Sequence, residues 1–441
     1  MVRYRKTSTS DSKTGRITPH LYDIGAHRAG TDGPIDPDFM CIFHTGKFFP
    51  QTKAMQNKIY TDNAATTAMD PRVLDAMLPY FLDVYANANS AHQPGRQAHV
   101  AVEEAREKIA GIIGAEPAEI VFTSGGTESN NAAIGGVLAA TGKSHVITSN
   151  AEHHAVLHPV ASAANRGIDS TLLPVDQTGK VSAADVAAAI GPHTALVSLM
   201  HGNNEVGTLN PIDEIAAVCR SNGVLFHSDT VQTVGKIPVH VDALGVDFLS
   251  MSAHKFYGPK GVGALYIRSG SAWKPWMEGG SQERRRRGGT LNVPGIVGMG
   301  KALELAASEM QENRTHVEKL KHALMQGLTE RLGTAVQFNG DPQNGLFNIV
   351  NCSFVHSAER AIDGEMLLLN LDIEGIYCSN GSACTSGAIE ASHVLLALGI
   401  PYDMAKSSIR FSLGKNNTID EIPLIIDKTE AILRRMTSQK L

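Results

Sequence analysis

The chain has 441 residues, 42% of them hydrophobic, and a formal net charge of −5. This length exceeds one typical domain, and the composition suits a large globular α/β protein. The small negative net charge does not indicate a basic surface that would bind a polyanion, so we expect no nucleic acid as a direct partner. No apolar run approaches the roughly 18 residues that a membrane-spanning helix needs, so we expect no membrane span.

The cysteines are few and scattered. The five are Cys41, Cys219, Cys352, Cys378 and Cys384. An odd number with irregular spacing predicts neither a disulfide framework nor a four-ligand zinc site, so we expect no intrinsic metal. This pattern is more typical of a protein of the reducing cytoplasm in which one cysteine has a special role.

Residues 1–57 differ from the rest of the chain. Ser/Thr and basic residues precede a Gly/Asp/Pro-rich stretch over 30–38, and no apolar periodicity persists. The segment lacks the apolar core of a secretory peptide, and its five aspartates argue against a transit peptide. We interpret it as a disordered extension, or as sequence upstream of a true start at Met55.

From Lys58 onward, helical and strand-like patterns alternate. Helices are predicted over 71–84, 97–113, 129–140, 154–166, 183–190 and 212–221, and strands over 120–123, 145–149, 169–174, 194–200, 224–227, 246–251 and 263–267. Short strands separated by helices predict an α/β fold whose mostly parallel central sheet is covered by helices. A charged helix over 313–332 begins a different region. We predict a large domain over 58–310 and a smaller α+β domain over 311–441.

The strand over 246–251 ends in Ser252-Ala253-His254-Lys255 and a turn rich in Gly and Pro. Buried strands of α/β proteins present reactive side chains at such ends. An ammonium loses hydration there, its pKa falls, and the neutral amine can attack a carbonyl carbon. The alternative is a lysine whose head lies in water.

Two other turns carry complementary groups. Ser124-Gly125-Gly126-Thr127 joins a strand to a helix and can offer backbone amides to an anion, although an ordinary turn would look the same. Asp229 can pair with a protonated ring nitrogen or cap a helix, and Gln232 would share its helical face and reach a ring oxygen. A turn that can bind an anion, a carboxylate that can pair with a ring nitrogen and an amine that can attack a carbonyl carbon together indicate pyridoxal phosphate.

A series of short motifs follows in order along the chain: Tyr60–Thr67, Phe122–Ser129, Glu152-His153, Asn203–Gly207, Asp229–Gln232, Ser252–Gly258, Arg287–Thr290, Gly381–Ser386 and Ser408–Ser412. From about Lys58 to its end, the chain resembles the NifS/IscS group of cysteine desulfurases. These belong to the class V aminotransferase branch of the fold-type I pyridoxal phosphate enzymes. The run Arg284–Arg287 is more basic than is typical of the group, and we interpret it as a solvated face.

The resemblance implies a homodimeric transferase that converts L-cysteine to L-alanine. It implies that Lys255 holds the cofactor and moves the α-proton, and that His153 stacks on the ring and acts as an acid or base. It places around the cofactor Gly126, Thr127, His153, Asn204, Asp229, Gln232, Ser252, His254 and Lys255. It further implies that Thr290 reaches a phosphate in the partner subunit, and that Arg410 and Asn204 bind the substrate. From the residues alone, His153 is a helix cap and Arg410 a surface arginine.

Cys384 lies among small residues, whereas a core cysteine usually has large apolar neighbours. An accessible thiolate can attack the substrate's sulfur and become a persulfide. The resemblance implies that the sulfur then passes to a protein acceptor, for iron–sulfur cluster assembly or thiolation. With a scaffold partner, Cys384 could also be a transient iron–sulfur ligand. Cys378 is not part of the motif.

Two other hypotheses stay open. One is a selenocysteine lyase or another class V aminotransferase. An aminotransferase would form a keto acid and would not need Cys384. The other is a paralogue that docks on an iron–sulfur scaffold with little turnover. The intact set of site residues argues against this second hypothesis.

Overall fold

The computed structural model describes residues 58–357, 360–380 and 390–438, and the following description concerns these ranges. The proposed extension over 1–57 and the cysteine at 384 therefore lie outside the described residues. By their contacts, residues 56–441 form one compact unit. The division into two domains at residue 310 stays a prediction.

The large sheet has seven strands in the order β2-β8-β7-β6-β5-β3-β4. They are β2 (Ile120–Thr123), β3 (His145–Ser149), β4 (Asp169–Leu173), β5 (Thr194–Met200), β6 (Leu225–Asp229), β7 (Phe248–Ser252) and β8 (Gly263–Ile267). The strands from β4 to β7 in this order are parallel, whereas β8 runs antiparallel to both β7 and β2. The predicted mostly parallel sheet is thus confirmed, with β8 as its exception.

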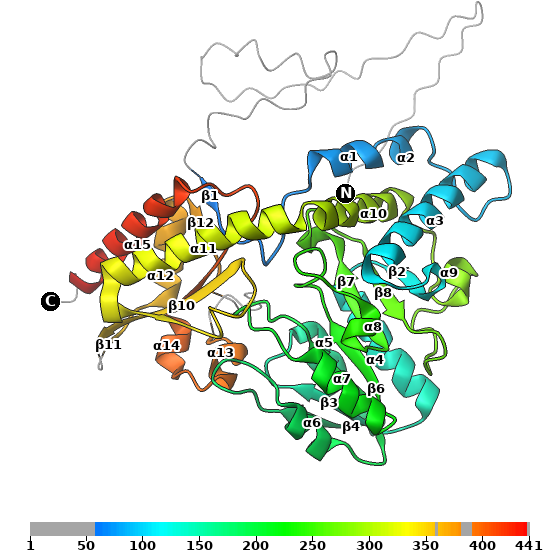
Figure 1. Ribbon diagram of the computed structural model, residues 1–441, viewed down its shortest axis with the longest axis horizontal. Helices are drawn as coiled ribbons and strands as arrows, with labels where there is room; N and C mark the ends of the chain where they lie inside the picture. Colours follow the sequence, from blue (N-terminus) through cyan, green and yellow to red (C-terminus); the bar gives the residue numbers. More distant parts are fainter. Residues whose placement is uncertain (1–57, 358–359, 381–389, 439–441) are drawn as a thin grey trace, which may run out of the picture. The chain divides into compact units, whose positions relative to one another are not determined.

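Helices cover both faces of this sheet (Figure 1). They are α3 (Gln93–Ile113), α4 (Gly126–Thr141), α5 (His154–Ala163), α6 (Ala183–Ala189), α7 (Ile212–Ser221), α8 (Val241–Leu244) and α10 (Val293–Ser308). Side chains alternate along each strand, so Ile120 and Phe122 enter one core cluster while Val121 enters the other. Strands β2, β5 and β8 are buried along their whole length, which explains their mostly apolar sequences, whereas the edge strand β4 is largely exposed.

Local signals explain where several helices begin and end. The helix predicted over 71–84 divides into α1 (Pro71–Met77) and α2 (Pro79–Leu82), because Pro79 has no N–H to continue a helix. Helix α3 ends at Gly114, as predicted, and this glycine has the left-handed φ of 69°.

Helix α10 was not predicted from the sequence, because the glycines within it are typical of a loop. A Cβ on Gly300 would lie 3.0 Å from Ala105, so the glycine lets α10 approach α3 closely.

The C-terminal part contains a smaller antiparallel sheet. Strand β10 (Ile349–Ser357) pairs with β9 (Val336–Phe338), β11 (Arg360–Ala361) and β13 (Ser408–Ser412). Helices α11 (Met310–Leu332) and α15 (Glu421–Ser438) lie side by side along it, with α12 (Gly364–Ile373) nearby (Figure 1). Short helices α13 (His393–Ala397) and α14 (Tyr402–Lys406) precede β13. This arrangement confirms a smaller α+β part.

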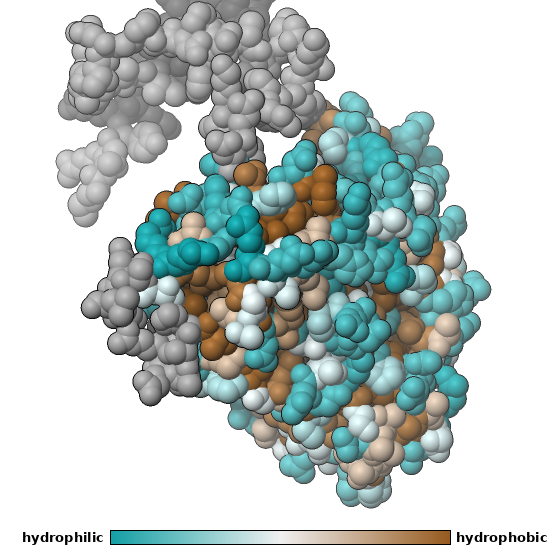
Figure 2. Space-filling model, turned by 60° about the vertical axis from the view of Figure 1, so that its left-hand side comes forward, coloured by the Kyte–Doolittle hydropathy of each residue, from teal (hydrophilic) through white to brown (hydrophobic). Residues whose placement is uncertain are grey.

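Strand β1 (Ile59–Tyr60) ties the start of the described chain to the C-terminal part. It pairs in parallel with β12 (Ile376–Tyr377), and the residues after it form a bridge between Asp62 and Ser412. The loop that follows β1 therefore lies beside β13. On the face shown in Figure 2, hydrophilic residues predominate and apolar ones are scattered among them. Within the described ranges, the helices are all too short or too polar to cross a membrane.

The arginine run contains a strained turn. In the segment α9 (Gln282–Arg285), Glu283, Arg284 and Arg285 have φ values of 45°, 57° and 65°. Buried Glu283 holds this turn in place, because its carboxylate accepts from Arg106 Nη2 at 2.7 Å and from the backbone N–H of Phe122 at 2.8 Å. The turn therefore keeps a left-handed backbone that favours glycine.

Replacing Arg285 with glycine should stabilise the protein, because Arg285 is exposed and glycine adopts a positive φ at little cost. We expect the free energy of unfolding to rise by about 0.5–1 kcal/mol, measured by urea denaturation. Lys319→Gly, at an exposed position inside α11, is the matched control and should lower it by about 1 kcal/mol. If both variants lowered the free energy of unfolding equally, the positive φ at Arg285 would not be a source of strain.

Candidate active site

A cavity of about 480 Å³ lies at the carboxyl ends of the parallel strands. Most of the residues singled out from the sequence line it: Gly126, Thr127, His153, Asn204, Asp229, Gln232, Ser252, His254, Lys255 and Arg410. Thr290 is exposed and is not among the lining residues, and Cys384 lies outside the described residues. Groups that are distant in sequence therefore surround one space, as a binding site at a sheet edge requires.

Lys255 follows β7 in a short 3₁₀ turn, Ala253–Lys255. Its Nζ donates hydrogen bonds to the backbone oxygens of Ala64 and Ala65, at 2.6 and 2.7 Å. Burial, together with the positive charge of Arg410, lowers the pKa of Lys255 to about 8. The alternative of a lysine head in water is therefore wrong.

Asp229 is the last residue of β6, which extends beyond the predicted end at residue 227. One carboxylate oxygen accepts from Asn130 Nδ2 at 2.6 Å, and the other accepts from the N–H of Val231 at 3.0 Å. The chain continues in turns rather than in the expected regular helix, yet Gln232 still reaches the cavity. Asn130 is buried, and its Oδ1 has no partner among the described residues.

The glycine turn after β2 leads into α4, which starts at Gly126 rather than at the predicted residue 129. The amides in the first turn of a helix lack helical acceptors, so they can face an anion. A Cβ on Gly126 would lie 2.6 Å from the side chain of Val231, so the glycine lets this turn lie close against Val231 at the cavity wall. Ser252 and His254 line the same cavity from the end of β7. Burial lowers the pKa of His254 to about 4, so the ring is neutral at pH 7.

His153 both caps a helix and lines the cavity. Its Nδ1 accepts from the N–H of Ala155 at 3.0 Å, at the start of α5. Because Nδ1 accepts this bond, the proton of the neutral ring is on Nε2. Burial lowers the pKa of His153, so the neutral ring predominates at pH 7. The helix cap read from the residues alone is therefore present alongside the site position that the resemblance implies.

Arg410 lies in the middle of β13, opposite Asn351 of β10. Its Nη2 contacts Asp62 at 2.7 Å, and its Nη1 donates to the backbone oxygen of Asn204 at 2.8 Å. The side chain is only 4% exposed, so the alternative of a surface arginine is wrong. Its buried Nε has no partner among the described residues.

Several lining residues were not assigned from the sequence: Asp62, Asn130, His154, Glu205, Ser379 and His393. Asp62 and Glu205 belong to motifs already noted, whereas His393 carries no sequence signal. The rings of His154 and His393 lie 4.6 Å apart between centroids. Within the described ranges, no group of three or more possible ligands could hold a metal ion.

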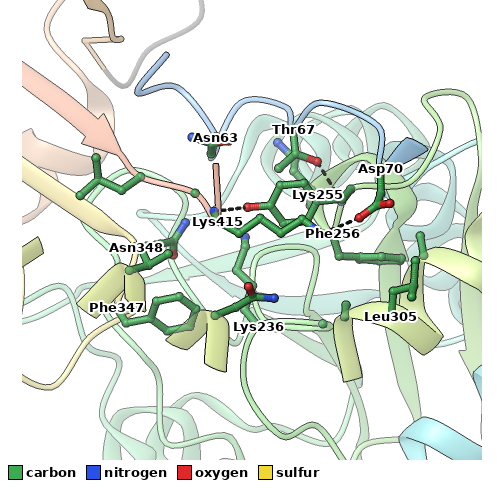
Figure 3. Close-up of a pocket in the computed structure, with 18 residues that line it drawn as sticks. Asn63, Thr67, Asp70, Lys236, Lys255, Phe256, Leu305, Phe347, Asn348 and Lys415 are labelled. Atoms are coloured by element: carbon green, nitrogen blue, oxygen red, sulfur yellow. Dashed lines mark hydrogen bonds and ion pairs between the residues drawn. The ribbon is translucent and has the colours of Figure 1, made fainter. Parts of the chain in front are cut away.

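A second, much smaller cavity of about 40 Å³ adjoins Lys255 (Figure 3). Lys236 and Lys415 also line it. Lys415 Nζ contacts Asp70 at 2.6 Å, and the N–H of Lys415 donates to the hydroxyl of Tyr257 at 2.8 Å. The space is large enough for only a few water molecules. The 480 Å³ cavity is therefore the candidate for a ligand.

The arrangement suits one kind of ligand. The N-terminus of α4 can hold an anionic group, Asp229 can pair with a protonated ring nitrogen, and Lys255 can bond to a carbonyl carbon. The unpartnered Nε of Arg410 leaves a guanidinium donor for a carboxylate.

Comparisons with known proteins agree with this geometry. The model of the family aminotransferase class-V matches residues 59–425. A protein named cysteine desulfurase IscS from Dictyoglomus turgidum is 48% identical over 385 residues, which cover 87% of this chain and 96% of that protein. A protein of the same name from Methanosarcina thermophila is 46% identical and covers 86% of this chain and 93% of its own length.

Solved structures show the same similarity. A NifS-like protein superposes with a TM-score of 0.79 at 40% identity, covering 86% of this chain and 99% of its own. A structure described as SspA in complex with cysteine has a TM-score of 0.70 at 35% identity, covering 82% of this chain and all of its own.

The lowered pKa of Lys255 makes a testable prediction. The neutral amine attacks aldehydes, so labelling of Lys255 by a small aromatic aldehyde should accelerate between pH 6 and 8 and level off above about pH 9. Borohydride trapping followed by peptide mass spectrometry measures this rate, with Lys255→Arg as the unlabelled control. A rate that still rises at pH 10, as for an ordinary lysine, would contradict the lowered pKa.

Proposed function

The chain belongs to the class V aminotransferase family, and from this premise we propose that it is a cysteine desulfurase. Such an enzyme converts L-cysteine to L-alanine and retains the sulfur for transfer. The observation that carries the proposal is the single cavity shared by Lys255, Asp229 and Arg410. Relatives named cysteine desulfurase, 43–48% identical across nearly the whole of their length, support the activity.

Pyridoxal phosphate is the cofactor that these residues would hold. The phosphate would lie at Gly126 and Thr127 with Ser252 and His254, and the ring would lie between Asp229, His153 and Gln232. Lys255 would bond to the aldehyde. When bound, this cofactor supplies an electron sink for negative charge at the substrate's α-carbon. The position of the α4 N-terminus, Asp229 and Lys255 around one cavity supports the fit.

The chain's own residues would transfer protons and bind the substrate. Lys255, with a pKa of about 8, can take and return a proton near neutral pH. Neutral His153 carries its proton on Nε2 and would offer this N–H as a hydrogen-bond donor in the cavity, and it would act as an acid only when the ring is protonated. Arg410 would bind the substrate's carboxylate in competition with Asp62, while Asn204 lines the same end. The ion pair keeps the guanidinium oriented before substrate arrives.

Cys384 is the proposed acceptor of the sulfur. Its thiolate attacks the sulfur of the substrate, the new S–S bond forms, and the C–S bond breaks. The electron pair of that bond stays on the substrate carbon, which takes a proton and leaves as alanine. Cys384 lies outside the described residues, so this role is supported by its sequence context and by the family.

The proposal extends to partners and location. We propose a homodimer in which Thr290, which is exposed, reaches a phosphate in the partner subunit. The persulfide would pass to a protein acceptor, such as an iron–sulfur scaffold, and the protein would be cytoplasmic. The relatives named IscS support iron–sulfur cluster assembly as the destination of the sulfur.

The variant Cys384→Ala tests the sulfur step. It should keep the visible absorbance of the bound cofactor and its change on adding cysteine, because the residues that hold the cofactor are unchanged. It should lose sulfide release from cysteine in the presence of a thiol reductant. A methylene blue assay measures the sulfide, and Cys378→Ala is the matched control that keeps activity.

Full sulfide release by Cys384→Ala would exclude the persulfide role. Keto acid formation by that variant would favour the alternative of a class V aminotransferase. A wild-type protein that binds cofactor and cysteine without releasing sulfide would favour a scaffold-docking paralogue.

A further inference from the structure

A lysine outside the expected set contacts the cavity wall. Lys236 lies in the turn after β6, and its Nζ donates to Gln232 Oε1 at 2.8 Å and to the backbone oxygen of Gln232 at 3.0 Å. Lys236 lines the small cavity next to Lys255, shown in Figure 3, while Gln232 lines the large one. Gln232 therefore lies between Lys236 and the ligand cavity.

The other end of the Gln232 amide is also fixed. Its Nε2 donates to the backbone oxygen of Ala64 at 2.8 Å, and Lys255 Nζ donates to the same oxygen at 2.6 Å. An ammonium group has donors only, so the amide oxygen must be the atom that faces Lys236. The NH₂ group is then held toward Ala64 and Lys255, and its second N–H remains for a ligand.

We infer that Lys236 is a positioning residue that fixes the amide of Gln232 with its donor toward the cavity. The ligand atom beside Gln232 must then be an acceptor, such as an anionic oxygen. The inference rests on the proposed function, since the ring oxygen next to the aldehyde of pyridoxal phosphate is such an atom. If the amide of Gln232 were rotated by about 180°, its oxygen would face the cavity and would repel the acceptor oxygen of the ligand.

The surroundings of Lys236 penalise its charged form. Burial and the positive charges of Lys255 and Arg410 lower the pKa of Lys236 to about 7. A neutral side chain would avoid this repulsion, but it would not fix the orientation of the amide. The protonated form, which predominates below about pH 7, donates a charged hydrogen bond that is about twice as strong as a neutral one, so it can hold the amide against rotation.

The test is the pH midpoint of the visible absorbance of the cofactor-loaded protein. A donor to the ring oxygen stabilises the deprotonated form of the bound cofactor, so losing the donor raises the midpoint. We expect Lys236→Met to raise it by on the order of one pH unit. Lys236→Arg keeps a charged donor and should leave the midpoint close to that of the wild type.

Loss of a positive charge alone would shift the midpoint in the same direction, so a double-mutant cycle is needed. In a Gln232→Leu background there is no amide to orient, and Lys236→Met should then add little further shift. An equal shift in both backgrounds would show that Lys236 acts through its charge, and would overturn the inference. An unchanged midpoint in Lys236→Met would also overturn it.

Gln232→Glu keeps Lys236 and replaces the NH₂ group with an oxygen, so it should raise the midpoint even if Lys236→Met does not fold. An unchanged midpoint in Gln232→Glu would contradict a donor at this position. A wild-type protein that develops no visible band with pyridoxal phosphate would overturn the proposed function as well. A normal wild-type band with an unshifted midpoint in Lys236→Met alone would overturn only the role of Lys236.

Discussion

The site depends on a largely buried lysine amine that is held between two backbone carbonyls. The oxygens of Ala64 and Ala65 accept from Lys255 at 2.6 and 2.7 Å, and both belong to the loop that follows β1. These dipoles hold the amine in place but do not fully offset the loss of hydration and the charge of Arg410, so the pKa falls. A partly neutral amine near pH 7 is thus a consequence of the fold.

Two parts of the chain build this environment. The parallel sheet supplies Asp229 and Lys255 from neighbouring strands, while β13 of the smaller sheet supplies Arg410. The loop after β1 joins them, because Ala64 contacts Lys255 while Asp62 pairs with Arg410. Arg410, where we propose that the substrate binds, and Lys255, where we propose that the chemistry occurs, are therefore linked through a few residues of one loop.

The sequence predicted the groups of the site better than their connections. Lys255, Asp229 and the glycine turn follow apolar strands, and strand ends can be recognised from local patterning. The burial of Arg410 and its pairing with Asp62 depend on tertiary packing, which local patterning does not reveal. The same holds for His153, whose sequence context indicated a helix cap and whose place in the cavity came from the resemblance. Helix α10 was missed because glycines that permit close packing against α3 also look like loop signals. The roles of Thr290 and Cys384 remain predictions.

The most direct test of the central claim is a crystal structure of the protein grown with pyridoxal phosphate. The account predicts continuous density from Lys255 Nζ to the cofactor, with the ring nitrogen within hydrogen-bonding distance of Asp229 and the phosphate at the start of α4. Cofactor bound elsewhere, or a ring whose nitrogen faces away from Asp229, would contradict it.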